Sequence, residues 1–291
     1  MDILWWVALA GMGFGVGIIA GMFGVGGGFL LTPLLIILFR VPELLAVGTG
    51  LCQMIGVSVS AQIRYARMGV GETKLGVMMT VPALLGVGLG KDIAVSLEEM
   101  GQITVLGREI AASRFWIAVC FLLLLSGIAL YMALDLRRGS PRTIPLPGPL
   151  TRISLPPYTE LPRTGRRISI PVAAYIGLGL GVLSGLLGVG GGVILTPLLI
   201  YGVGMSVAMS AGTGVTMLLA TSLWGTFSYA QSERVSLPIA LVLLTGSTFG
   251  AQIGALIATR FDGTKLRGIF VLLVALTAAA VLVDLIKALT G

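Results

Sequence analysis

Ten apolar segments alternate with short polar stretches along the chain. The first half contains segments 3–22, 29–39, 42–63, 75–90 and 115–134, and the second contains 171–187, 193–203, 207–230, 237–259 and 268–289. A membrane-spanning helix needs about 20 apolar residues, because each residue adds about 1.5 Å across a hydrocarbon core about 30 Å thick. Most of the segments approach that length, so the pattern predicts an all-α polytopic membrane protein.

Two of the segments, 29–39 and 193–203, are too short to cross a bilayer. Each directly follows a glycine cluster, Gly26–Gly28 or Gly190–Gly192, and consecutive glycines break a helix rather than continue it. We therefore predict a short or re-entrant helix, entered from a glycine-lined turn, at both places.

The starts of the two short helices follow from the residues after the glycines. Thr32-Pro33 and Thr196-Pro197 offer a threonine N-cap before a proline at the first helical position. The helices begin either at these prolines or one turn earlier, at the last glycines.

The second glycine cluster belongs to a repeat of the first half of the chain. The stretch GMFGVGGGFLLTPLL at Gly21–Leu35 returns 164 positions later as GLLGVGGGVILTPLL, with eleven of fifteen residues identical. The same offset relates Gly48-Thr49-Gly50 to Gly212-Thr213-Gly214 and Tyr65 to Tyr229. A series of matches at one offset indicates an internal duplication: repeat 1–135, linker 136–170 and repeat 171–291.

Charge gives the orientation of the two repeats. The linker contains one acid, Glu160, and seven arginines: Arg137, Arg138, Arg142, Arg152, Arg163, Arg166 and Arg167. The positive-inside rule places it in the cytoplasm, and counting outward puts equivalent loops of the two halves on opposite sides. That is an inverted repeat, with five crossings per half, or three if each glycine hairpin is re-entrant.

Two connecting segments carry weaker signals. Seven prolines between Pro141 and Pro162 predict an extended, helix-free linker. In segment 91–114, the spacing of Ile93, Leu97, Met100 and Ile103 predicts a short surface helix.

Composition supports a membrane protein and excludes several other classes. The chain is 56% hydrophobic and 11% charged, with a mean hydropathy of +1.03, whereas soluble domains carry about 25% charged residues. The net charge of +7 lies largely in the linker, which argues against nucleic-acid binding. The N-terminal stretch resembles a first membrane segment rather than a removable signal peptide, and we expect a multi-pass protein of the cell inner membrane.

The inventory of reactive residues is small. The chain has no His and two Cys, Cys52 and Cys120, both in apolar segments. No disulfide framework, metal centre, cofactor or catalytic residue is therefore expected, and an enzyme acting within the membrane is the weakest interpretation. No charged residue lies deep inside a segment, so coupling to protons or to another ion stays open, as does a homodimer.

The glycine clusters are the candidate substrate site. Irregular backbone within a bilayer must be buried in protein or line a wet cavity, and broken helices in inverted repeats mark transporter sites. The free N–H groups and positive dipole ends of two such helices would bind an anion without a charged side chain. The glycines assigned to this site are Gly26, Gly27, Gly28, Gly190, Gly191 and Gly192.

The other interpretation of glycines in membrane helices is close helix packing. We favour it for Gly21, Gly24, Gly86, Gly90, Gly250 and Gly254. A phosphate-binding loop is disfavoured, because no Lys-Ser/Thr pair follows the glycines.

Uncharged polar side chains complete the candidate site. Hydroxyl and amide groups ligate an oxyanion by hydrogen bonds, and the candidates are Thr32, Thr49, Gln53, Thr196, Thr213 and Thr216. The alternative is that the hydroxyls bond back to helix carbonyls.

The doubled GVGGG-x3-TP motif, with Val47-Gly48-Thr49 and Ala211-Gly212-Thr213, resembles the signature of the TauE/SafE family of membrane permeases. The resemblance covers nearly the whole chain. It implies a secondary transporter, most simply an exporter, of sulfite, sulfoacetate or a related small sulfur-containing anion. It also implies alternating access, with the glycine clusters and Gly-Thr-Gly turns as the substrate site. An anion channel of the same architecture is the alternative.

One position departs from the family pattern. The second half of the family's signature resembles Gly-Thr-Ser-x-x-Gln, whereas this chain has Met217 at the last position, so no amide lies opposite Gln53.

Overall fold

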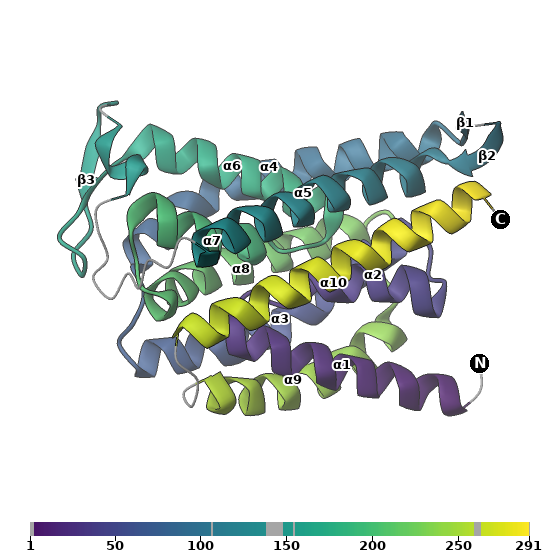
Figure 1. Cartoon of the computed structure of the whole chain (residues 1–291), viewed down its shortest axis with the longest axis horizontal. Helices are drawn as coiled ribbons and strands as arrows, with labels where there is room; N and C mark the ends of the chain where they lie inside the picture. Colours follow the sequence, from purple (N-terminus) through teal and green to yellow (C-terminus); the bar gives the residue numbers. More distant parts are fainter. Residues whose placement is uncertain (1–2, 106, 138–147, 154, 259–262, 291) are drawn as a thin grey trace.

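The computed structural model describes the chain except for residues 1–2, 106, 138–147, 154, 259–262 and 291, and it is built almost entirely of helices (Figure 1). The first half forms α1 (Ile3–Phe23), α2 (Gly28–Phe39), α3 (Glu43–Arg67), α4 (Thr73–Glu99) and α5 (Ala112–Arg137). The second forms α6 (Ile170–Leu187), α7 (Gly192–Pro197) with its π-helical continuation η2 (Leu198–Val203), α8 (Val207–Ala230), α9 (Leu237–Ala258) and α10 (Gly263–Thr290). Every predicted apolar segment is therefore a helix.

Eight of the described helices are long and apolar enough to cross a membrane. The two shorter apolar helices are Gly28–Phe39 and Gly192–Val203, the segments predicted to be too short. The all-α polytopic fold expected from the sequence is thus confirmed.

Two short β-hairpins lie in segments for which the sequence predicts other structures. The predicted surface helix over 91–114 is wrong in its second part: α4 runs on to Glu99, and β1 (Gln102–Val105) then pairs antiparallel with β2 (Arg108–Ala111). Gly101 and Gly107 adopt positive φ values of 70° and 80°, so the first ends the helix and the second forms the turn.

The linker contains more order than the extended connector that its prolines predict. It holds the 3-10 turn η1 (Pro149–Arg152) and an antiparallel hairpin of β3 (Tyr158–Glu160) and β4 (Arg167–Ser169). Two of its expected positive charges, Arg138 and Arg142, lie outside the described residues.

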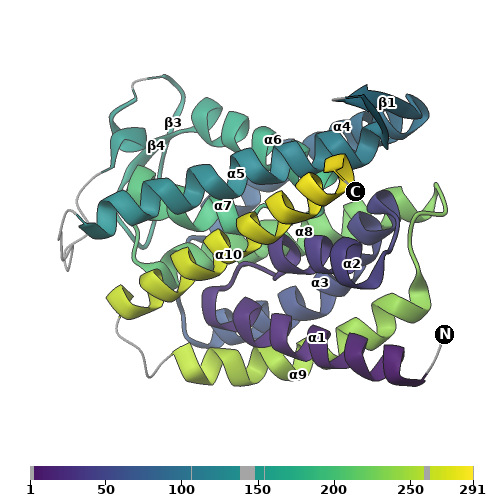
Figure 2. The same cartoon turned by 45° about the vertical axis from the view of Figure 1, so that its right-hand side comes forward.

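Each half begins with a hairpin that folds back at the glycine cluster (Figures 1 and 2). The ring of Trp5, at the start of α1, lies 5.3 Å from that of Phe39, at the end of α2. In the second half, Arg166, just before α6, donates a hydrogen bond to the carbonyl of Val203, at the end of η2. The short helices therefore return to the end of the bundle from which α1 and α6 started.

The two hairpins open at opposite ends of the bundle. We call the end with both chain termini the terminal end; it carries the ion pairs Arg114–Asp284 (3.0 Å) and Arg234–Glu98 (2.7 Å). The other, the linker end, carries the β3–β4 hairpin. In the first half the chain enters at the terminal end and leaves at the linker end, and in the second half it runs the opposite way. A re-entrant inverted repeat requires this arrangement.

The linker hairpin is fixed to the linker end by Glu72, which is 1% exposed. Its Oε1 accepts hydrogen bonds from the backbone N–H groups of Arg163 and Thr164, both at 2.7 Å. Lys74 adds a bond to the carbonyl of Glu160 at 3.2 Å. The two backbone N–H groups thereby satisfy the buried carboxylate of Glu72. Glu72 also joins the loop after α3 to the linker.

Glycines spaced four residues apart bring α1 onto α9 and α6 onto α4. A Cβ added to Gly13 would lie 3.0 Å from the carbonyl oxygen of Leu243, and one on Gly17 or Gly21 would overlap the α9 backbone. The matching stripe in α6 faces α4, and in return Gly86, Gly90, Gly250 and Gly254 face the backbones of α6 and α1. Gly21, Gly86, Gly90, Gly250 and Gly254 thus make close helix contacts, as the packing interpretation predicts. The same interpretation is wrong for Gly24, which follows α1 and has a φ of 65°.

We expect Gly17→Ala to destabilise the protein, because its Cβ would overlap the Ser247 backbone and force α1 away from α9. Overpacking of this kind costs about 1–3 kcal/mol, which lowers Tm by several degrees in a protein of about this size. Thermal unfolding of the detergent-purified protein measures it. Gly15→Ala is the matched control, since nothing lies within 4 Å of that position; equal Tm values for the two variants would contradict the prediction.

Candidate functional site

The two glycine breaks have the same backbone conformation. The φ angles are 65°, 77° and 78° at Gly24, Gly26 and Gly27, and 68°, 69° and 73° at the equivalent Gly188, Gly190 and Gly191. Only glycine adopts this left-handed region without strain. The helices begin at Gly28 and Gly192 with Gly27 and Gly191 as N-caps, so the start at the last glycines is correct and the start at Pro33 and Pro197 is wrong.

The two breaks meet in the interior of the bundle. A Cβ on Gly28 would overlap the carbonyl oxygen of Gly188, and one on Gly192 would lie 2.8 Å from the carbonyl oxygen of Val25. All four residues are buried. Segments 164 positions apart in the sequence are therefore in direct backbone contact, which brings the two short helices together at their N-terminal ends.

The breaks leave a run of backbone donors without partners. In the described part of the chain, no acceptor bonds the N–H groups of residues 25–29 or 189–193. Pairing resumes at Leu30 and Leu31, which donate to Gly27 at 3.1 and 3.0 Å, and at the equivalent Ile194 and Leu195, which donate to Gly191. Buried unpaired N–H groups are costly, and at a helix N-terminus they favour an anion.

Two equivalent side chains, Met54 and Leu218, lie against both breaks. A Cβ on Gly26 would be 2.7 Å from a Leu218 methyl carbon and 3.2 Å from the Met54 sulfur, and a Cβ on Gly190 would meet the same two side chains. Both residues are fully buried or nearly so. Because Met is flexible and adapts its shape, this apolar filling can rearrange without moving a helix.

Two of the predicted polar residues, Thr32 and Gln53, are fully buried, and their side chains find no hydrogen-bond partner among the described residues. The Thr32 hydroxyl lies 3.1 Å from the position of a Cβ on Gly188, and thus faces the second break. Gln53 occupies the position equivalent to Met217, whose methyl lies 3.1 Å from a Cβ on Gly191. A buried amide without a partner costs about 1–3 kcal/mol, and its retention suggests a use.

The hydroxyls of Thr49 and Thr213 have partners within the protein. Thr49 accepts a hydrogen bond from the backbone N–H of Ser236 at 3.1 Å, and Thr213 accepts one from that of Glu72 at 2.8 Å. Positions 72 and 236 are also equivalent, so each threonine holds a loop of the opposite repeat. Thr213 also donates to the carbonyl of Met209. This is the bond back to a helix carbonyl that the alternative interpretation predicts.

The remaining two predicted hydroxyls lie elsewhere. Thr216 donates to the amide oxygen of Gln62 at 3.3 Å. Thr196 is 8% exposed and lines a small cavity with Phe23 and Phe270.

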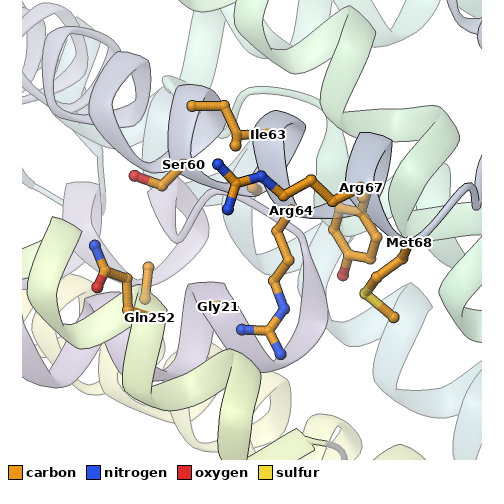
Figure 3. Close-up of a pocket in the computed structure, with 10 residues that line it drawn as sticks. Gly21, Ser60, Ile63, Arg64, Arg67, Met68 and Gln252 are labelled. Carbon is orange, nitrogen blue, oxygen red and sulfur yellow. The ribbon is translucent and has the colours of Figure 1, made fainter.

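A cavity of about 570 Å³ opens near the linker end between α1, α3 and α9 (Figure 3). A neighbouring cavity of about 220 Å³ shares Gly21, Arg64, Tyr65 and Met68 with it and extends to Phe23 and Ala211. The Tyr65 hydroxyl lies 3.1 Å from the position of a Cβ on Gly24. The two cavities therefore reach from the linker end to Phe23 and Tyr65, which adjoin the first residue of the first break.

The sequence did not identify this cavity as part of a site. From the sequence, Arg64 is only a fallback candidate for a functional charge, because a solvated residue at the end of its segment is the favoured interpretation. The usable signal was the helical spacing of Ser60 and Arg64 on one face of α3, but nothing in that spacing points to Gln252 on α9.

We expect Thr213→Val to lower the stability of the protein, because it leaves the buried N–H of Glu72 without an acceptor at a cost of about 1–3 kcal/mol. Thr213→Ser keeps the oxygen and should behave like the wild type in thermal unfolding. A Thr213→Val variant with unchanged Tm would show that the hydroxyl does not anchor the loop.

Comparisons with known proteins agree with the fold and the motifs. A probable membrane transporter protein of Xylella fastidiosa strain 9a5c is 27% identical over 261 residues, covering 89% of this chain and 87% of the relative. The probable membrane transporter protein YdhB of Bacillus subtilis strain 168 is 25% identical over 242 residues, covering 83% and 86%. No solved structure matches the chain.

The family comparison covers almost the whole chain. The model of the family described as sulfite exporter TauE/SafE matches residues 9–281. Together with the relatives' names, this makes the protein a multi-pass membrane transporter rather than an enzyme. The chain belongs to the TauE/SafE sulfite exporter family.

Proposed function

We propose that the protein is a secondary transporter that exports a small anion, most simply sulfite, sulfoacetate or a related sulfur oxyanion or sulfonate. The substrate binds between the two repeats at the paired glycine breaks. In this proposal the protein lies in the inner membrane with the linker in the cytoplasm, and export is coupled to protons or to another ion. The observation that carries it is the double set of unpaired backbone N–H groups, at residues 25–29 and 189–193, that meet inside the bundle.

The ligand set would be backbone donors supplemented by Gln53 and Thr32. Both side chains are buried without a partner, and an anion would satisfy the amide N–H₂ of the first and the hydroxyl of the second. A site made of dipoles binds an anion without the strong attraction of a fixed charge, so the anion can also leave. Transport requires both steps.

Alternating access is supported by a difference between two equivalent tyrosines. At the terminal end, Tyr229 is fully buried and donates a hydrogen bond to the carbonyl of Gly185 at 2.7 Å. At the linker end, the described contacts include no such bond between Tyr65 and Gly21, and both residues line the open cavities instead. The two halves thus differ as an inward-open transporter requires, and the reverse state would exchange the roles of the two tyrosines.

An anion channel of the same architecture is the second candidate, favoured by the absence of charged residues at the breaks. Counterflow separates the two. In proteoliposomes preloaded with unlabelled sulfite, a transporter accelerates the entry of labelled sulfite, whereas a channel does not. If no sulfur oxyanion or sulfonate is exchanged or conducted, the proposed function is wrong.

We expect Gln53→Met to abolish transport while preserving or raising stability. The side chains are similar in size, and Met, present at the equivalent position 217, removes two unpaired buried polar atoms. Counterflow should fall at least tenfold, since loss of one hydrogen bond to a charged ligand is worth about 1.5–3 kcal/mol.

The matched control is Met217→Leu, which changes the equivalent position without removing a polar group and should retain counterflow. A Gln53→Met protein that transports normally would remove Gln53 from the site. One that unfolds would mean that the amide has a structural role instead.

A further inference from the structure

Arg64 places a positive charge in the linker-end cavities, at a position where the second half of the chain has a serine. Arg64 lines both cavities, whereas its equivalent in the second repeat is Ser228, which is 8% exposed. Around this position the repeats agree, with Tyr65 matching Tyr229 and Gly21 matching Gly185. The two halves of the chain therefore share the tyrosine and the glycine at this place and differ at the arginine.

The surroundings of Arg64 suit a small oxyanion. In Figure 3 its side chain runs toward Gly21 of α1, while Arg67 extends toward Ser60, and Gln252 of α9 lies on the opposite wall. A Cβ on Gly21 would overlap the α9 backbone at Ala251, so this wall of the cavity carries no side chain at position 21. The cavity thus combines the hydroxyl of Ser60 and the amide of Gln252 with the guanidinium of Arg64, whose planar N–H fork binds oxyanions with two bonds.

We infer that Arg64 forms an anion-capture site in the linker-end cavity, separate from the glycine breaks, that takes a small oxyanion or sulfonate before it moves inward. This rests on the proposed function for the identity of the anion and for its onward path. A cation in a cleft with low-dielectric walls raises the local concentration of anions. Because the equivalent position of the second repeat is Ser228, the protein captures its substrate preferentially from the linker side.

An anionic lipid headgroup presents the same chemistry as a free anion, but the shape of the cavities favours the free anion. The second cavity continues from Arg64 past Phe23 to Ala211, and a Cβ on Gly24 would lie 2.7 Å from the Ala211 Cβ. The second cavity thus ends at Phe23 and Ala211, next to the first glycine break, where Gly24 and Ala211 are in close contact. The larger cavity, about 570 Å³, far exceeds the roughly 30 Å³ of a water molecule and accepts an anion with part of its hydration shell.

A labelling experiment tests capture independently of transport. Met68→Cys, on a background of Cys52→Ala and Cys120→Ala, places a single thiol at a residue that lines both cavities together with Arg64. Its reaction rate with a sulfonate-bearing methanethiosulfonate is compared with that of a trimethylammonium-bearing one, in proteoliposomes of neutral lipid. The sulfonate reagent should react faster, and sulfoacetate, which does not react with the reagent, should slow it. Arg64→Gln should lower the ratio of the two rates at least fivefold and abolish the protection by sulfoacetate.

The matched control is Arg67→Gln, which removes one charge from the same cavity. It should change the ratio less than twofold and keep the protection by sulfoacetate. Equal effects of the two variants would indicate a general surface potential and overturn the proposal. If Arg64→Gln changes the ratio of the two rates only when phosphatidylglycerol is added, the site binds lipid, and the proposal is wrong.

Transport gives the second measurement. In proteoliposomes of sorted orientation, Arg64→Gln should raise the KM for sulfite from the linker side about tenfold and leave kcat and the KM from the terminal side unchanged. Equal KM changes on both sides would overturn the assignment to capture. If the wild type transports no sulfur anion but the labelling results hold, the proposed function fails while the capture site stands.

Discussion

A polypeptide cannot leave backbone N–H groups unpaired in lipid, and the arrangement of this protein follows from that constraint. Two glycine clusters interrupt membrane helices and free the N–H groups of residues 25–29 and 189–193. Neither break is tolerable if it faces hydrocarbon. Each is covered by the other, through the contacts of Gly28 with Gly188 and of Gly192 with Val25. Burial of the breaks therefore requires both repeats, and it places the candidate site between them.

The same dependence extends to the rest of the bundle. The long helix pairs, α1 with α9 and α4 with α6, each join one repeat to the other through glycine stripes. Thr49 and Thr213 likewise hold loops of the opposite repeat. In the alternating access that we propose, contacts that cross between the repeats would have to shift, and the flexible Met54 would allow the space between the breaks to adjust.

The sequence predicted the elements well and the contacts poorly. Runs of apolar residues located every membrane helix, since span length is a local property, and the glycine clusters located both breaks. The hairpin at 102–111 was missed because its apolar residues fit a helical spacing as well as a strand, and Gly101 decided the outcome. The partners of Thr49 and Thr213 lie in the other repeat, about 140 to 190 positions away. No local pattern reveals a bond of that kind, or the cavity that joins Arg64 to Gln252.

The positions of charged and uncharged groups fit the requirements of anion transport. A fixed cation at the breaks would bind an anion tightly in a low-dielectric interior and would slow its release, so dipoles and an uncharged amide suit the central position better. Attraction from solution still needs a charge, because dipole fields fall off quickly with distance. Placing Arg64 in the cavity at the linker end, and Ser228 at the equivalent position near the terminal end, separates the two tasks. In the mechanism that we propose, the linker-end cavity concentrates the anion on one side, and the glycine breaks bind it weakly enough for it to be released on the other.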